Sequence, residues 1–209
     1  MKALIIVDVQ YDFLPGGALA VDDGDQILPI INRLQEKFDL VVATQDWHPR
    51  EHGSFAANHE GKKPGDFVQL GNVDQVLWPV HCVQGSRGAE FHEDLDQSRW
   101  ERVIRKGMNP YVDSYSGFFD NDRREDTGLG QFLKDKGVGE IVVTGLALDY
   151  CVKYTVLDAI KLGFDATLVS DATRAVNLYP QDDDNAIKEM IKAGAEVVSS
   201  AAFLNKGNL

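Results

Sequence analysis

Six segments of the chain are strongly apolar and have the length of a β-strand. Their apolar character is almost continuous, which is typical of strands buried on both faces of a parallel sheet. These segments lie at residues 3–9, 40–44, 102–106, 140–145, 165–171 and 195–200. The pattern therefore predicts one six-stranded, mostly parallel sheet.

Helical patterns separate most of these predicted strands. Apolar residues recur at helical spacing over residues 25–38, 150–163 and 182–194, and a shorter pattern covers residues 130–137. Three of the patterns end on a glycine, which is a common helix stop. Strands that alternate with helices predict an α/β fold of three layers, with helices on both faces of the sheet.

Two long segments interrupt this alternation. The chain has 209 residues, and we expect one domain over residues 1–209. Residues 46–100 hold all five histidines and all three tryptophans, whereas residues 107–126 are rich in turn formers and aromatic residues. Loops of such length in a compact domain are usually functional when they are ordered. We therefore expect a loop insertion at about residues 46–100 to carry a binding site.

The chain is acidic, with 33 Asp and Glu residues against 21 Lys and Arg residues and a formal net charge of −12. This charge repels phosphate groups, so we expect neither a nucleic acid partner nor binding to an anionic membrane surface. The longest apolar stretches are too short to span a membrane. The N-terminal stretch "MKALIIVDVQ" is typical of a first strand, not of a signal peptide. Together with only two cysteines, these features predict a cytoplasmic protein with free thiols.

Four polar side chains stand where predicted strands end: Asp8, Asp46, Lys106 and Cys151. Ligands of parallel sheets bind beyond the carboxyl ends of the strands, so we expect these groups at the functional site. Cys151 is expected in the first turn of a helix that starts near Asp149. There the helix dipole would lower the thiol pKa below its usual value of about 8.5, and free backbone N–H groups could hold an oxyanion.

Asp8, Lys106 and Cys151 together suit nucleophilic catalysis. A carboxylate can take the thiol proton, an ammonium group can stabilise both anions, and the thiolate can attack a carbonyl carbon. Alternatively, the cysteine is a small buried apolar residue, the aspartate is a turn acceptor and the lysine is solvated. The residue types by themselves leave both interpretations open.

A second polar group comes from the segments "QDWHPREH" and "WPVHC". Asp46 and His48 are two residues apart, so in an extended segment both side chains point the same way. With His81 they offer two imidazoles and a carboxylate, which suit zinc, iron or manganese and leave coordination positions open. Hydrogen-bonded loop residues are the alternative, and whether His52 joins the group stays open.

The motifs resemble those of the nicotinamidases, within the isochorismatase-like cysteine hydrolases. The similar segments are "IIVDVQYDFLPGGALAV", "ATQDWHP", "GSFAANH", "WPVHCVQGSRGAEFH", "KGMNPYVDSYSGFFDN" and "VTGLALDYCVKYTVLDAIKLGF". The segments with the Asp-x-His pair, "WPVHC" and "DSYSGFFDN" are more specific to nicotinamidases than the segments around Asp8 and Cys151. The resemblance therefore indicates both the fold, that of an isochorismatase-like hydrolase, and the substrate class.

The resemblance also implies roles for particular residues. It implies a catalytic triad and a site for one divalent ion, zinc in the first place with iron or manganese as alternatives. The triad is Asp8, Lys106 and Cys151, and the metal ligands are Asp46, His48 and His81. The backbone N–H groups of Ala147 and Cys151 would form the oxyanion hole, beside a cis peptide bond before Ala147. Phe13, Trp78 and Tyr115 would line the pocket for the substrate ring.

Together these features predict a metal-dependent cysteine amidohydrolase that converts nicotinamide to nicotinate and ammonia through a thioester, in NAD salvage. One alternative is another isochorismatase-like hydrolase that acts on isochorismate or a ureido compound, and the metal segment argues against it. The other is a non-catalytic binding protein on this fold, and the complete triad argues against it. The sequence leaves open the identity of the metal and whether the chain forms a homo-oligomer.

Overall fold

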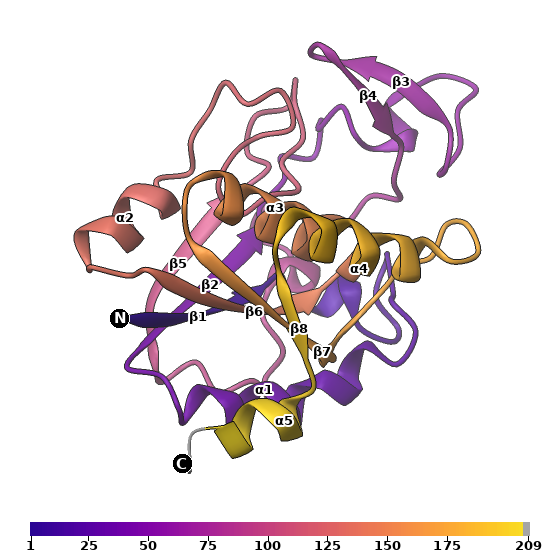
Figure 1. Cartoon of the computed structure of the whole chain (residues 1–209). Coiled ribbons are helices and arrows are strands. Elements are labelled where there is room, and N and C mark those ends of the chain that lie inside the picture. The colour runs from indigo at the N-terminus through magenta and orange to yellow at the C-terminus, as the bar shows by residue number, and fades with distance from the viewer. Residues whose placement is uncertain (207–209) are drawn as a thin grey trace.

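The computed structural model describes residues 1–206, and a six-stranded sheet forms its centre (Figure 1). The strand order is β5-β2-β1-β6-β7-β8, and each neighbouring pair in this sheet is parallel. The strands are β1 (Lys2–Val7), β2 (Leu40–Asp46), β5 (Trp100–Lys106), β6 (Glu140–Leu146), β7 (Asp165–Arg174) and β8 (Glu196–Val198). The predicted α/β fold with a six-stranded parallel sheet is confirmed.

Helices cover both faces of this sheet (Figure 1). The helices are α1 (Leu28–Gln35), α2 (Leu129–Asp135), α3 (Lys153–Lys161), α4 (Asp182–Ala193) and α5 (Ser200–Lys206). Residues of α2, α3 and α4 pack into one hydrophobic core, and residues of α1 and α5 pack into the other. The sequence pattern did not reveal α5, whose seven residues make two short turns.

Every position of β1 from Ala3 to Val7 is apolar, because both faces of this strand are buried. Ala3, Ile5 and Val7 face the core that contains α3, whereas Leu4 and Ile6 face the core that contains α1. Successive side chains of a strand point to opposite faces, so a strand with helices on both sides must be apolar at every position. The continuous apolar segments of the sequence have this origin.

The strand order places a crevice next to β1. From β1 the chain first builds the sheet toward β2 and β5, and later continues on the other side with β6, β7 and β8. The strand order therefore reverses between β1 and β6, and open parallel sheets bind ligands at such a reversal, beyond the carboxyl ends of the strands. Four adjacent strands, β5, β2, β1 and β6, bring their carboxyl ends to this edge.

The long segment between β2 and β5 contains an antiparallel hairpin. It is formed by β3 (Phe67–Leu70) and β4 (Val73–Val76), and it stands apart from the main sheet in Figure 1. We did not predict this hairpin, because strands of four residues are too short to show a clear period. The other long segment, residues 107–126, contains neither an α-helix nor a strand longer than an isolated bridge.

The helix that carries Cys151 begins where it was predicted, but with a turn of a different type. Residues Leu148–Val152 form a π-helical turn, in which the Val152 N–H donates to the Ala147 carbonyl, and α3 begins only at Lys153. The helix therefore starts within one residue of the predicted start near Asp149, and Cys151 lies in its first turn as expected, but that turn is π-helical. Single π-helical turns are frequent at functional sites.

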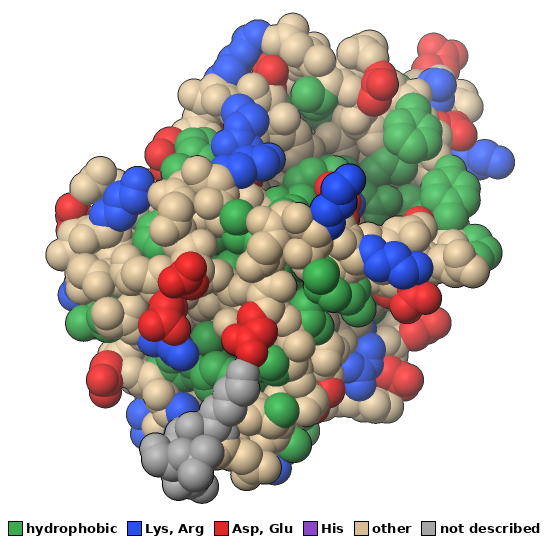
Figure 2. Space-filling view, viewed as in Figure 1, with side chains coloured by type: hydrophobic (Ala, Val, Ile, Leu, Met, Phe, Trp, Pro, Cys, Tyr) green, Lys and Arg blue, Asp and Glu red, His purple; other side chains and the backbone are tan. Residues whose placement is uncertain are grey.

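The outer surface carries charges of both signs. Figure 2 shows acidic and basic side chains scattered over the visible face, and hydrophobic side chains gathered in a hollow toward the upper right. Within residues 1–206, no helix combines the length and the apolar character that crossing a membrane requires.

Candidate active site

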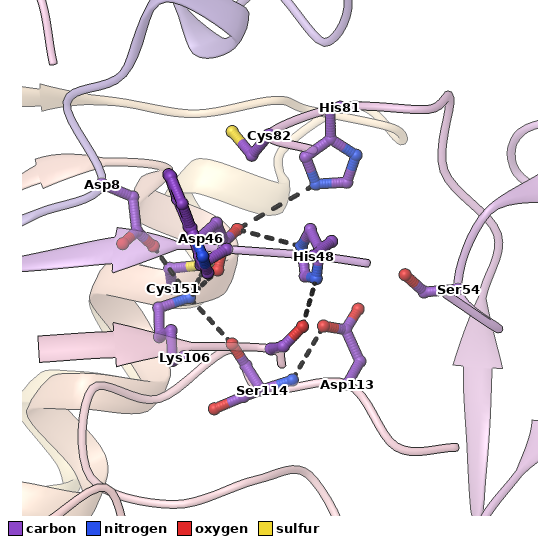
Figure 3. A network of polar contacts seen from close by, with 12 residues as sticks. Asp8, Asp46, His48, Ser54, His81, Cys82, Lys106, Asp113, Ser114 and Cys151 are labelled. Atoms are coloured by element: carbon purple, nitrogen blue, oxygen red, sulfur yellow. Dashed lines mark hydrogen bonds and ion pairs between the residues drawn. The ribbon is translucent and has the colours of Figure 1, made fainter. Parts of the chain in front are cut away.

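Asp8, Lys106 and Cys151 meet at the carboxyl edge of the sheet (Figure 3). The Lys106 Nζ atom lies 2.8 Å from Asp8 Oδ2 and 3.4 Å from Cys151 Sγ. Asp8 follows β1, Lys106 ends β5 and Cys151 comes shortly after β6. The structure thus brings together three side chains that are far apart in the sequence, with the ammonium group between the thiol and the carboxylate.

Lys106 is held among anions and backbone oxygens in the interior. Its Nζ atom also lies 2.5 Å from Asp46 Oδ1 and donates to the Ser114 carbonyl at 2.8 Å, and the residue is only 2% exposed. Burial alone would lower the pKa of Lys106, but the carboxylates of Asp46 and Asp8 raise it well above its usual value. The ammonium group therefore stays charged.

Asp8 is fully buried and is placed by its neighbours. The Thr44 hydroxyl donates to its Oδ1 atom at 2.7 Å, across the parallel pair β1 and β2. Burial raises the pKa of Asp8 to about 6, although the charge of Lys106 opposes this rise. A carboxyl group with a raised pKa can accept and return a proton near neutral pH, as a general base requires.

The environment of Cys151 differs from the one that we expected. Burial raises the pKa of the Cys151 thiol well above its usual value, and the charge of Lys106 acts in the opposite direction. The side chain is 6% exposed, and its sulfur atom lies within 4.8 Å of a carboxylate oxygen of Asp8. The lowered thiol pKa that we expected at this position is therefore not found.

Asp46, His48 and His81 form a second group beside this trio (Figure 3). The Asp46 Oδ2 atom lies 3.6 Å from His48 Nε2 and 4.0 Å from His81 Nε2. Burial would raise the pKa of Asp46, but the charges of Lys106 and His48 hold it well below its usual value. One ionised carboxylate thus faces two imidazole nitrogens in a buried space.

The hydrogen bonds of the two imidazoles fit a metal ion. His48 Nδ1 lies 2.8 Å from the Gly107 carbonyl, and His81 Nδ1 lies 2.8 Å from the Pro79 carbonyl. Because a carbonyl only accepts, each Nδ1 carries a proton, and in the neutral ring the Nε2 atom is then free to bind an ion. A Cβ on Gly107 would lie 2.3 Å from the His48 ring, so only glycine allows this ring position.

His52 and Asp113 extend this group on its other side. Atoms of His48, His52 and Asp113 lie within 4.8 Å of one another, and the rings of His48 and His52 have centroids 4.4 Å apart. The His52 Nδ1 atom accepts from the Ser54 N–H, which leaves the ring proton on Nε2. That Nε2 atom is buried and has no hydrogen-bond partner among the described residues.

A pocket connects the two groups. Its wall is mostly aromatic and apolar, with Asp46, His81 and Cys151 at its polar end. The full lining is Phe13, Leu19, Asp46, Trp78, His81, Asp113, Tyr115, Ala147, Tyr150, Cys151 and Val176. All three aromatic residues that the resemblance implied for a ring pocket therefore line this space.

The backbone near Cys151 has the form that the resemblance implied. The peptide bond between Leu146 and Ala147 is cis. Ala147 directly precedes the π-helical turn and Cys151 lies within it, and both residues line the pocket. Their backbone N–H groups are thus candidates for contact with a bound carbonyl oxygen.

Several contributors to the site were missed in the sequence. Thr44, Ser114 and Asp113 contact the predicted residues, and Leu19, Tyr150 and Val176 complete the pocket. Thr44 could have been recognised, since it lies two residues before Asp46 and so shares its direction in the strand. Asp113 and Ser114 lie in the family segment "DSYSGFFDN" and Tyr150 begins the helical pattern at residues 150–163, but neither signal gave these residues a role.

The chain matches the description "Isochorismatase domain" over residues 2–202. It belongs to the isochorismatase family. A nicotinamidase of Escherichia coli (strain K12) is 49% identical over 204 residues, which cover 96% of this chain and 95% of that protein. The family expected from the motifs is thus confirmed, and the similarity extends over nearly the whole chain.

Solved structures of relatives agree with this assignment. A nicotinamidase/pyrazinamidase of Acinetobacter baumanii superposes with a TM-score of 0.94 at 45% identity, covering 97% of each chain. A pyrazinamidase of Pyrococcus horikoshii in complex with zinc superposes with a TM-score of 0.77 at 39% identity, covering 95% of this chain and 98% of that one. The arrangement of strands described above is therefore shared with enzymes that act on small amides.

Proposed function

We propose that this protein is a metal-dependent nicotinamidase, which hydrolyses nicotinamide to nicotinate and ammonia. One observation carries the proposal: a single pocket lies between two polar groups. The first is Cys151 with Asp8 and Lys106, and the second is Asp46 with His48 and His81. The similarity to nicotinamidases over nearly the full chain supports the same substrate.

Cys151 is the nucleophile and Asp8 is the base in this proposal. Asp8 takes the proton from the Cys151 sulfur, and the thiolate attacks the carbon of the substrate amide. Lys106 contacts both groups, so its charge stabilises the carboxylate before the proton transfer and the thiolate after it. The high thiol pKa makes this coupling to Asp8 necessary.

The reaction then proceeds through a thioester. The Ala147 and Cys151 N–H groups hold the oxyanion, and the protonated Asp8 gives its proton to the departing ammonia. Asp8 next takes a proton from a water molecule, whose oxygen attacks the thioester carbon and releases nicotinate. The proton returns to the Cys151 sulfur, so the protein ends in its starting form.

The group of Asp46, His48 and His81 is proposed to hold one divalent ion. This ion would bind the ring nitrogen of nicotinamide and so orient the amide. Zinc is the first candidate, since the pyrazinamidase of Pyrococcus horikoshii was solved with zinc, and iron and manganese suit the same donors. His52 carries its ring proton on Nε2, so we infer that it donates to water at the ion and is not a direct ligand.

The aromatic wall is proposed to bind the substrate ring. Phe13, Trp78 and Tyr115 enclose the pocket between the metal-binding group and Cys151. A flat pyridine ring can stack among such side chains, while its amide points toward the sulfur. A homo-oligomeric state and a cytoplasmic location stay predictions from the sequence.

Ammonia release from a panel of amides tests the proposal, with metal analysis of the same sample. Nicotinamide should be hydrolysed, and each chain should carry about one divalent ion. Release of ammonia from a ureido compound but not from nicotinamide would favour the other hydrolases of the family. No release from any amide by metal-loaded protein would refute the nicotinamidase proposal and favour either an isochorismate hydrolase or a non-catalytic role.

A further inference from the structure

One buried amide side chain of the β3–β4 hairpin, that of Gln75, bonds to residues around the pocket. Gln75 in β4 is 1% exposed. Its Nε2 atom lies 2.7 Å from the Tyr115 hydroxyl, 3.2 Å from Asp113 Oδ2 and 2.8 Å from the Val76 carbonyl. Carbonyl and carboxylate oxygens only accept, so the NH₂ end of the amide must face these partners. One side chain therefore bonds to both a pocket-wall residue and a buried acid.

The other end of the same amide is also held. Its Oε1 atom accepts from Asn121 Nδ2 at 3.2 Å, and Asn121 Oδ1 accepts from the Tyr115 N–H at 2.9 Å. Gln75 is thus bonded at both ends, and Tyr115 is bonded through its hydroxyl and its backbone. A buried amide with partners at both ends has one orientation, since any rotation would leave buried polar atoms unpaired.

The partners of Gln75 belong to the two halves of the site. Tyr115 lines the pocket, and its hydroxyl also accepts from Trp78 Nε1 at 3.1 Å, so two aromatic wall residues meet at this oxygen. Asp113 lies against His48 and His52 beside the metal-binding group, and Figure 3 shows its carboxylate next to His48. Gln75 is not itself among the described residues that line the pocket.

We propose that Gln75 is a positioning residue that sets the aromatic wall of the pocket relative to the metal-binding group. The inference rests on the proposed function, because the correct spacing is the one that lets a substrate ring lie between Tyr115 and His81. Gln75 acts through Tyr115 and Asp113 and does not touch the substrate. The hairpin that the sequence pattern did not reveal is therefore part of the site, and supplies its support from outside the main sheet.

The decisive variant is Gln75→Leu, which keeps the approximate size of the side chain and removes its hydrogen bonds. Tyr115 and Asp113 then each lose a buried partner, and the wall is free to shift. We expect the KM for nicotinamide to rise about tenfold, since a buried polar group without its partner costs binding on this scale. The kcat should fall less than the KM rises, because Asp8, Lys106 and Cys151 keep their contacts.

Gln69→Leu is the matched control on the same hairpin. Gln69 lies in β3, is exposed and bonds to Asp74, away from the pocket. The control and the wild type should have the same KM. If the wild-type protein does not hydrolyse nicotinamide, the proposed function fails; if it does and Gln75→Leu leaves the KM unchanged, only the present inference fails.

A double-mutant cycle with Tyr115→Phe separates positioning from a general loss of stability. If Gln75 acts through the Tyr115 hydroxyl, Gln75→Leu should raise the KM much less in the Tyr115→Phe background than in the wild type. Equal effects in both backgrounds would overturn the inference. Should Gln75→Leu not fold, Gln75→Met replaces it in the cycle, because it has a similar length and carries neither the two N–H donors nor a charge.

Discussion

Lys106 lies between two buried carboxylates, those of Asp8 and Asp46, and contacts both. Its ammonium group also lies 3.4 Å from the Cys151 sulfur. Two carboxylates thus share one ammonium group in the interior, and a proton moved from the thiol to Asp8 leaves the total charge unchanged. Lys106 contacts the negative charge both before and after the transfer, which offsets part of the cost that the raised thiol pKa imposes.

We predict that Lys106→Met lowers both activity and stability. The kcat for nicotinamide should fall about 100-fold or more, the usual scale for loss of assisted proton transfer. The free energy of unfolding should fall by about 3 kcal/mol, because two buried acids lose their counter-charge. Steady-state kinetics and urea unfolding measure the two effects.

Lys136→Met is the control for this variant. Lys136 pairs with Glu101 at 2.7 Å on the surface, where both side chains are largely exposed. Surface pairs contribute about 0–1 kcal/mol, so this variant should keep wild-type activity and nearly wild-type stability. Wild-type turnover by Lys106→Met would remove Lys106 from the mechanism.

The two cysteines differ in how easily a reagent can reach them. Neither has a lowered thiol pKa. Burial raises the pKa of both thiols, but Cys151 lines the pocket whereas Cys82 is fully buried with its Sγ 3.8 Å from the Gly88 carbonyl. Under limiting iodoacetamide we predict that Cys151 is alkylated first, that activity falls in step with its modification, and that nicotinate protects it. Peptide mapping by mass spectrometry measures this order.

Substitution of each cysteine provides the matched comparison. Cys151→Ala should abolish turnover, and Cys82→Ser should leave it largely intact. Loss of activity while Cys151 stays unmodified would refute its assignment as the nucleophile.

At the scale of elements, the parallel pairing of β1 with β6 brings Asp8 and Cys151 to opposite sides of the crevice. Gly145 in β6 has a φ of +107°, and a Cβ on it would lie 2.1 Å from the Val7 carbonyl oxygen. Only glycine lets the two strands approach in this way directly before Asp8. The π-helical turn Leu148–Val152 then carries Cys151 back toward β1.

We predict that Gly145→Ala strongly destabilises the fold. The added methyl group meets backbone atoms of Val7 and the residue keeps an unfavourable φ, so the free energy of unfolding should fall by about 3 kcal/mol or more. Gly139→Ala is the control, since a Cβ there meets nothing within 4 Å. Urea unfolding of both variants tests this, and equal midpoints would contradict the close approach of the two strands.

At the scale of the whole molecule, the pocket is assembled from distant parts of the chain. Phe13, Trp78, Tyr115 and Cys151 come from segments separated by more than thirty residues each, and they meet only in the folded protein. The hydrophobic cores on the two faces of the sheet hold these segments in place. A rigid pocket of this kind can distinguish ligands of nearly equal shape through one polar contact.

We predict that metal removal abolishes the preference for nicotinamide over benzamide. The two amides have nearly the same shape, but only nicotinamide offers a ring nitrogen to an ion held by Asp46, His48 and His81. With metal bound, the kcat/KM for nicotinamide should be far higher; after chelation the difference should largely disappear, and added zinc should restore it. Equal rates on both amides with metal bound would refute substrate orientation by the ion.

Much of the fold could be predicted because its signals are local. Continuous apolar segments arise wherever a strand has helices on both faces, and five of the six predicted segments overlap their strands over most of their length. The short hairpin of β3 and β4 and the helix α5 gave no such signal. Short helices and strands are stabilised mainly by the segments against which they pack. Their own residues do not reveal which segments these are.

For the site, the sequence by itself determined which chemical groups follow the strands: Asp8, Asp46, Lys106 and Cys151, in motifs typical of one enzyme family. The tertiary structure alone decided that β5 lies beside β2 and β2 beside β1, which brings Lys106 against Asp8 and Asp46. It also decided that burial outweighs the charge of Lys106 in setting the pKa of the Cys151 thiol. Residue types and local periods determine the secondary structure and the chemical groups of a segment. Contacts between distant segments, and the removal of water from around a charge, arise only when the whole chain has folded.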